Sequence, residues 1–291
     1  MAVLEVTDLK KSYKVGFIPK KQLVLKGLSF KVEPGKITGF LGGNGAGKTT
    51  TMKCMLGLAY PDAGEVKFFG KSKLDADVKS RIGFLPERPY FYEYLTGVEF
   101  LLFYGRLSGD TPKSVLMERI ERLLKRVDLW HAKDKKLRGY SKGMLQKIGL
   151  AQALIHDPEF VILDEPMSGL DPDGRFYVAE IIKETAKEGK SVFLSSHLLP
   201  DVERLCEDLV ILRQGVGVFH GTTEDFLKKM GSDTTISYFQ SGHKKQVTVN
   251  TEDDLQKEIS KLVSDGCTIV DVKRDTNLED AFIRVGLRGD E

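Results

Sequence analysis

Residues 37–50 read ITGFLGGNGAGKTT, and this stretch decides the fold. An apolar strand pattern over 37–41 runs straight into a glycine-rich loop, and residues 51–59 (TMKCMLGLA) predict a helix. The loop fills the pattern GxxxxGK[ST], in which glycines let backbone N–H groups wrap a polyphosphate and the helix N-terminus faces it. The stretch therefore predicts a nucleotide site built from a strand, a loop and a helix.

This loop supplies most of the candidate binding residues. Lys48 is expected to pair with the β and γ phosphates, and Thr49 to hold Mg²⁺. A glycine-rich turn that merely precedes a helix is the alternative interpretation. The candidate nucleotide-binding residues are Gly42, Gly43, Asn44, Gly45, Ala46, Gly47, Lys48, Thr49 and Thr50.

A second motif, FVILDEP at 160–166, places two carboxylates at the end of an apolar strand. The carboxyl edge of a parallel sheet is where ligands bind. Asp164 is suited to a metal-bound water, and Glu165 to orienting or deprotonating an attacking water. A strand followed by a solvated acidic turn is the alternative, and the phosphate loop earlier in the chain argues against it.

The rest of the first 220 residues alternates strand and helix patterns, which favours a parallel sheet with crossover helices. A loop at 15–22 is expected between the first two strands, and Thr111 and Pro112 are expected as N-cap and first residue of a helix. Strands are predicted at 3–9, 28–32, 37–41, 65–69, 82–85, 160–163, 192–194 and 209–212, and helices at 95–107, 115–127 and 144–155.

The composition changes near Gly221, where polar alternating strands follow. Strands are expected at 234–239, 246–250 and 268–272, with a helix from Thr251 to a stop at Gly266 and another at 278–285. Residues 221–291 are therefore expected to form a small accessory α+β domain. No chemistry could be assigned to it.

Composition excludes several classes of protein. The chain has 291 residues and a net charge of +2, so no strong basic field points to nucleic acid as a partner. Cys54, Cys206 and Cys267 show no metal-ligand spacing, and three cysteines favour a reducing compartment. The N-terminus does not read as a secretory signal, and no apolar run has the length of a membrane helix.

Three further motifs complete an ordered set: YSKGMLQK at 140–147, SGLD at 168–171 and SSH at 195–197. With the phosphate loop and the Asp–Glu strand end, this set resembles the ATP-binding cassette (ABC) ATPases over roughly residues 1–220. The resemblance implies an α/β P-loop fold with an N-terminal antiparallel β subdomain, a parallel-sheet core and a helical subdomain at about 88–158. It also implies ATP and Mg²⁺ as ligands.

The resemblance assigns roles by position. Tyr13 matches the aromatic residue that stacks on adenine, and Ser141 and Gly143 match signature residues that reach the γ-phosphate of the opposite subunit. Asp171 matches the aspartate of the D-loop, and His197 matches the switch histidine that contacts the γ-phosphate. From the residues alone, Tyr13 also fits an aromatic residue at the end of a strand. His197 also fits a satisfied core or turn histidine. Because a Ser-capped helix N-terminus is a second anion site that one chain cannot fold onto its own loop, two chains are expected to face each other.

The chain also departs from the common family pattern. Glu87 stands where the family usually has Gln, and as a carboxylate it is a candidate Mg²⁺ ligand beside Thr49 and Asp164. Lys142 and Met144 replace the usual Gly and Gln of the signature segment. These variations, with the NLEDAFIRV segment near the C-terminus, resemble the cassette subunits of ABC type-2 exporters, which pair with separate membrane permeases.

Two surface segments have two interpretations each. Residues 88–107 are rich in aromatics and fit either a helical core or a groove that receives a coupling helix of a permease. The basic cluster Lys133, Lys135, Lys136 and Arg138 fits a solvated loop, with contact to anionic lipid as the other interpretation.

Together these features predict an ATPase subunit that dimerises over two MgATP and drives export through a separate permease, from the cytoplasmic face of the membrane. A homodimer is expected, and Glu165 is expected to act as base, with Asp171 and His197 completing the catalytic set. The alternatives are a soluble ABC ATPase of translation or DNA repair, an importer cassette, and a nucleotide sensor without turnover. The cargo is not readable from this chain.

Overall fold

The computed structural model describes residues 1–15, 20–109, 111–230, 234–240, 243–249, 251–274 and 278–287. These residues divide into two compact units. The first unit comprises Met1–Leu198 and Leu205–His220, and the second comprises Leu199–Arg204 and Gly221–Glu291. In the described part of the chain, no helix combines the length and the apolar character needed to span a membrane.

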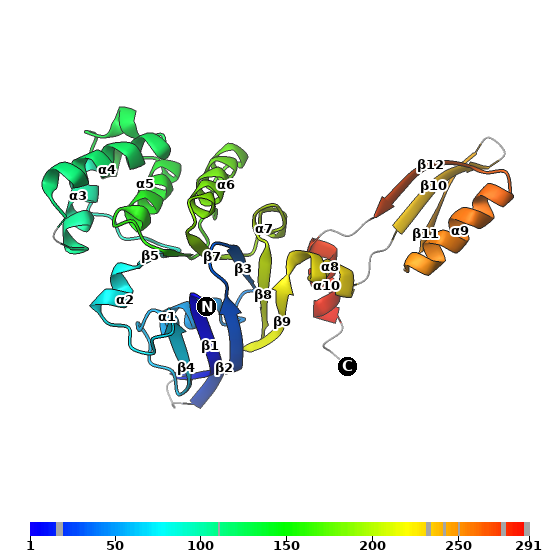
Figure 1. Cartoon of the computed structure of the whole chain (residues 1–291), viewed down its shortest axis with the longest axis horizontal. Coiled ribbons are helices and arrows are strands. Elements are labelled where there is room, and N and C mark those ends of the chain that lie inside the picture. The colour runs from blue at the N-terminus through cyan, green and yellow to red at the C-terminus, as the bar shows by residue number, and fades with distance from the viewer. Residues whose placement is uncertain are drawn as a thin grey trace. The chain divides into compact units, whose positions relative to one another are not determined.

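The first unit contains two sheets (Figure 1). An antiparallel sheet has the order β2-β1-β4, and a six-stranded sheet has the order β5-β6-β7-β3-β8-β9, with β5, β6, β7, β3 and β8 parallel. The strands are β1 Leu4–Val15, β2 Lys20–Val32, β3 Ile37–Leu41, β4 Ala63–Phe68, β5 Ile82–Leu85, β6 Phe160–Leu163, β7 Ser191–Ser196, β8 Asp208–Arg213 and β9 Val216–Thr222.

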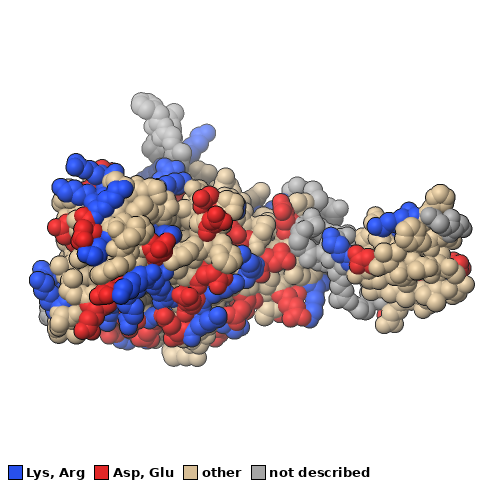
Figure 2. Space-filling model, turned by 90° about the horizontal axis from the view of Figure 1, so that it is seen from above, with Lys and Arg blue, Asp and Glu red and all other residues tan. Residues whose placement is uncertain are grey.

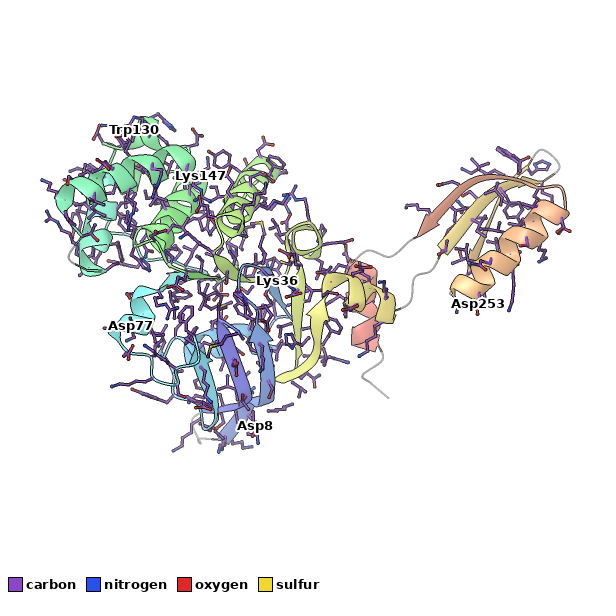
Figure 3. The ribbon with its side chains drawn as sticks, in the orientation of Figure 1. Asp8, Lys36, Asp77, Trp130, Lys147 and Asp253 are labelled. Atoms are coloured by element: carbon purple, nitrogen blue, oxygen red, sulfur yellow. The ribbon has the colours of Figure 1, made fainter. Side chains whose placement is uncertain are left out.

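Helices connect and flank these strands. Figure 1 shows α3, α4 and α5 gathered into one helical group, in which each helix contacts the other two. Lys147 on α5 also places its Nζ 4.0 Å from the ring centroid of Tyr177 on α6 (Figure 3). The helices of this unit are α1 Lys48–Met55, α2 Ala76–Ser80, α3 Gly97–Leu107, α4 Lys113–Arg126, α5 Lys142–Leu154 and α6 Pro172–Lys187.

Aromatic packing joins the two sheets of the first unit. Phe30 of β2, Phe40 of β3 and Phe193 of β7 are almost fully buried, with ring centroids 5.2 to 5.7 Å apart. Each such ring pair contributes roughly 0.5–1.5 kcal/mol beyond the burial of its area. Strand β3, which leads into the phosphate loop, is therefore held by aromatic contacts with β7 in its own sheet and with β2 in the other sheet.

The second unit has its own small sheet, in the order β11-β10-β12, and its own apolar core. Ile236, Leu255, Leu262 and Cys267 form that core, and the positive φ of Gly266 ends α9 as expected. The elements are α7 Leu199–Leu205, which begins in this unit, α8 Thr223–Met230, β10 Thr234–Gln240, β11 His243–Val249, α9 Glu252–Ser264, β12 Thr268–Arg274 and α10 Leu278–Leu287.

The expected fold class is confirmed, and the strands at 37–41, 82–85 and 160–163 match β3, β5 and β6. Two local predictions are wrong. Of the loop expected at 15–22, residues 15 and 20–22 are strand residues, because β1 and β2 stay paired there although the apolar alternation stops earlier, and 16–19 lie outside the described residues. Pro112 has ψ of 140° and is the N-cap of α4, so neither it nor Thr111 takes the predicted position.

Candidate nucleotide site

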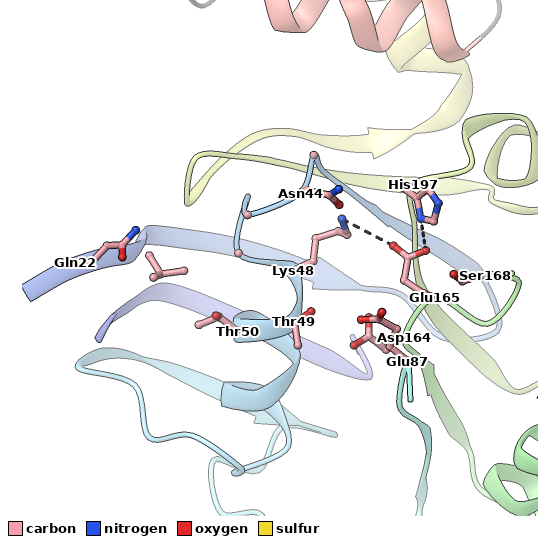
Figure 4. Close-up of a pocket in the computed structure, with 14 residues that line it drawn as sticks. Gln22, Asn44, Lys48, Thr49, Thr50, Glu87, Asp164, Glu165, Ser168 and His197 are labelled. Carbon is pink, nitrogen blue, oxygen red and sulfur yellow. Dashed lines mark hydrogen bonds and ion pairs between the residues drawn. The ribbon is translucent and has the colours of Figure 1, made fainter. Parts of the chain in front are cut away.

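A cavity of about 450 Å³ opens at the carboxyl ends of the parallel strands of the first unit (Figure 4). Strand β3 leads into the phosphate loop, β5 into Glu87, β6 into Asp164 and Glu165, and β7 into His197. The lining residues are Gln22, Val24, Gly43, Asn44, Gly45, Gly47, Lys48, Thr49, Thr50, Glu87, Asp164, Glu165, Ser168 and His197. Parallel order thus brings four separate segments to one edge of the sheet.

The loop backbone needs glycine at particular positions. Gly47 has φ of +112°, and a Cβ there would lie 2.8 Å from Leu25 Cδ2. At Gly42, a Cβ would lie 2.6 Å from the carbonyl oxygen of Leu212. Gly43 and Gly45 have no neighbouring atom within 4 Å of that position, so the loop faces open space. This is a backbone cradle of the kind that holds phosphates at the N-terminus of a helix.

Lys48 lies between the loop and the acidic strand end. Its Nζ donates a hydrogen bond of 2.6 Å to the carbonyl of Gly42 and lies 3.9 Å from Glu165 Oε1. The side chain is only 10% exposed, so its charge acts at the cavity. A cation held here suits the oxygens of a polyphosphate.

Glu165 is the most constrained acidic residue of the site. Its Oε2 lies 2.7 Å from Nδ1 of His197, its side chain is 11% exposed, and its backbone φ is +51° (Figure 4). A left-handed conformation at a residue other than glycine is uncommon and concentrates at functional sites. The structure thus brings together Glu165 and His197, two residues that were predicted separately as catalytic.

Asp164 is buried beside two other carboxylates. Its Oδ1 accepts a hydrogen bond of 2.6 Å from the Ser195 hydroxyl. Burial raises the pKa of Asp164, the Ser195 bond offsets part of that effect, and the negative charges of Glu165 and Glu87 raise the pKa further. Among the described residues, no three His, Cys, Asp or Glu side chains are grouped so that they could hold a metal ion by themselves. A divalent cation in this cavity would therefore need phosphate oxygens among its ligands, beside the oxygens of Asp164, Glu87 and Thr49.

Not every expected site residue lines this cavity. Tyr13 pairs with Gln22 across β1 and β2 and is 37% exposed beside Lys11. Ser141 caps α5 by accepting from the amide of Met144, and Asp171 caps α6 by accepting from the amide of Gly174. Gly143 also lies outside the lining set, as do Gly42 and Ala46, whose backbones shape the loop.

Gln22 and Val24 were not predicted from the sequence, and Ser168 and Ser195 were named there only as members of the SGLD and SSH motifs. Gln22 and Val24 approach the loop because β2 extends further than its apolar pattern indicates. Ser195 had one available signal, its position directly before the serine and histidine of SSH on a strand that ends at the cavity.

A strand, glycine loop and helix beside an Asp–Glu strand end define a P-loop nucleoside triphosphatase. The family model described as ABC transporter matches residues 25–168. An uncharacterized ABC transporter ATP-binding protein of Nostoc sp. is 46% identical over 80% of this chain and 70% of its own length. The Linearmycin resistance ATP-binding protein of Bacillus subtilis is 35% identical over 82% of this chain and 76% of its own.

A solved structure of an ATP binding subunit of an ABC transporter has a TM-score of 0.69 at 32% identity, covering 78% of this chain and 92% of that one. The chain therefore belongs to the ABC transporter ATP-binding proteins. As a member it binds ATP, hydrolyses it and serves as the ATP-binding subunit of a transporter.

Proposed function

We propose that this subunit powers export through a separate membrane permease, by hydrolysing MgATP in the cavity where Lys48, Glu165 and His197 meet. The main support for this proposal is that the Glu165 carboxylate lies beside Lys48 of the phosphate loop and is held there by His197. Export is favoured over import because one relative serves resistance to linearmycin. Removing a compound from the cell is a direct route to resistance.

The roles of the residues follow from their places in the cavity. Loop amides of 43–47 and Lys48 bind the phosphates, while Thr49, Asp164 and Glu87 would hold Mg²⁺, which supplies charge neutralisation at the phosphate oxygens. Glu165 accepts a proton from the attacking water as the bond between the γ-phosphorus and the bridging oxygen breaks. His197 holds the Glu165 carboxylate in place. Tyr13, on β1 opposite Gln22 of β2, would stack on the adenine ring.

We further propose a homodimer, since Ser141 and Gly143 lie outside the cavity of their own chain. The N-terminus of α5 presents a serine hydroxyl and a partial positive charge, which suit the γ-phosphate bound to a second subunit. Asp171, at the start of α6, would lie at the same interface.

Ser141→Arg in both chains is expected to abolish steady-state ATP turnover while leaving ATP binding to the isolated chain unchanged. The bulky cation would fill the space that the partner's nucleotide needs. Turnover and fluorescent-nucleotide titration check this result. Ser114→Arg, at the first turn of α4, is the matched control, and normal turnover of the Ser141 variant would contradict the composite site.

The contact with the permease is assigned to an aromatic surface cluster. Tyr90 and Tyr94 are 80% and 67% exposed, and each ring contacts Tyr92 with centroids 5.8 and 6.1 Å apart. Phe103 of α3, 39% exposed, extends the cluster with a centroid 5.3 Å from Tyr92. Exposed aromatic patches of this kind mark protein interfaces. We therefore propose that the subunit works at the cytoplasmic face of the membrane, and the exposed aromatic cluster supports this proposal.

Nucleic acid is not proposed as a partner. Figure 2 shows Lys, Arg, Asp and Glu interspersed over the face of the first unit that it displays. Within the basic cluster, Lys133 pairs with Asp134 at 2.6 Å, which favours a solvated loop.

We also propose 1–220 as the ATP-binding domain, with its helical subdomain at about 88–158, and 221–291 as the accessory domain.

Purification of tagged Glu165→Gln protein from native membranes with MgATP tests the proposed function. Slowed hydrolysis would keep the ATP-bound assembly together, and a polytopic membrane protein is expected to co-purify. A Lys48→Ala variant purified in parallel controls for ATP-independent capture. Recovery of ribosomes or DNA-repair factors without any membrane protein would overturn the transporter assignment.

A further inference from the structure

We propose that Ser195 is a positioning residue for ATP hydrolysis, which sets the backbone from which the Glu165 carboxylate reaches the cavity. The proposal rests on the proposed role of Glu165. Ser195 itself is fully buried and is not among the residues that line the cavity, so we give it no direct catalytic role.

The Ser195 hydroxyl joins both members of the Asp–Glu strand end. It is fully buried on β7, it donates a 2.6 Å hydrogen bond to Asp164 Oδ1, and it accepts a 2.9 Å hydrogen bond from the backbone N–H of Glu165. Only a group that both donates and accepts satisfies this pair of contacts. One hydroxyl therefore ties the two residues that directly follow β6 to the neighbouring strand β7.

The Glu165 backbone needs such an anchor. Its φ of +51° is disfavoured for a residue with a Cβ, and conformations of this kind persist only where the surroundings hold them. Ser195 holds the N–H of Glu165, and the Glu165 carbonyl accepts from the amide of Ser168 at 3.1 Å. The next carbonyl, of Pro166, accepts from Gln146 Nε2 at 2.7 Å.

This anchored turn determines where the carboxylate lies. From it, Glu165 reaches Lys48 Nζ at 3.9 Å on one side and His197 Nδ1 at 2.7 Å on the other. Without the Ser195 hydroxyl, the partly buried N–H of Glu165 loses this partner and the turn is free to relax. A small displacement of a catalytic group is enough to cost about 10²-fold in rate.

Ser191 provides a matched control on the same strand. It is 2% exposed, and its hydroxyl accepts a 2.9 Å hydrogen bond from the amide of Gly35 at the opposite end of β7. Replacing either serine by alanine thus removes one buried hydroxyl from β7. Only Ser195 contacts the acidic strand end.

Ser195→Ala in the full-length chain is expected to lower kcat for ATP by about 10- to 100-fold while KM changes by less than about twofold. Ser191→Ala is expected to keep kcat near wild type. Steady-state hydrolysis over a range of MgATP concentrations measures both constants. An unchanged kcat in Ser195→Ala, or an equal loss in Ser191→Ala, would overturn the proposal.

A double-mutant cycle separates this proposal from the role of Glu165. If Ser195 acts through Glu165, adding Ser195→Ala to Glu165→Gln causes no further loss in single-turnover rate, because the group being positioned is already disabled. A full additional loss would sink the positioning role while leaving Glu165 assigned. Normal hydrolysis by Glu165→Gln alone would instead remove the proposed function of Glu165.

Discussion

Replacing Glu165 by Gln lowers the rate of ATP hydrolysis by about 10²- to 10⁴-fold, the usual contribution of a general base. The amide keeps the shape of the side chain and can still meet His197 Nδ1, but it cannot take a proton from water at neutral pH. Binding of ATP is retained, because the phosphate loop and Lys48 are untouched. Single-turnover hydrolysis and nucleotide titration measure the two effects separately.

Glu33→Gln is the matched control for this variant, since Glu33 is exposed in the turn before β3 and lies outside the cavity. It makes the same change of charge and should hydrolyse ATP like the wild type. A Glu165→Gln enzyme with an undiminished rate would show that another group accepts the proton. The role of Glu165 beside Lys48 would then be limited to the effect of its negative charge.

Replacing Lys48 by Ala weakens ATP binding by about 10- to 150-fold, as expected for loss of roughly 1.5–3 kcal/mol from a hydrogen bond to a charged group. Turnover falls as well, because the ammonium offsets the charge that develops on the phosphate oxygens during hydrolysis. The side chain is nearly buried, so solvent does not replace it efficiently. Equilibrium titration with ATP and ADP checks the expected loss.

Lys53→Ala removes the same charge from α1 at an exposed position away from the cavity. ATP affinity close to that of wild type is expected for this control. Equal affinity in Lys48→Ala would mean that the ammonium remains engaged with Gly42 and Glu165 when nucleotide is bound. That outcome would assign the phosphate contacts to the loop amides.

Much of the nucleotide site was predictable because its functional residues occur in short contiguous motifs. The run 42–49 carries its own backbone requirement for glycine, and the positive φ of Gly47 and the close approach at Gly42 are its structural counterparts. The apolar strand before Asp164 likewise identified the edge of the sheet. In both cases a local pattern and the final environment agree.

Other features could not be read from local patterns. The extension of β2 that brings Gln22 and Val24 to the cavity depends on backbone pairing with β1. The polar residues in this part of β2 do not predict that pairing. The second unit likewise combines segments that are distant in sequence. Leu199–Arg204 belongs to it together with residues from 221 onward, and Glu203 accepts a hydrogen bond from the amide of Leu278.

By itself, the amino-acid sequence determined that this chain has a phosphate loop, an acidic strand end and the ordered motifs of an ABC ATPase, because each depends on neighbours along the chain. The order of strands was decided only by the tertiary structure. Placing β7 between β6 and β3 is what sets Ser195 against Asp164 and Glu165, and His197 against the Glu165 carboxylate. These contacts arise from long-range packing of buried strands, which no short segment encodes.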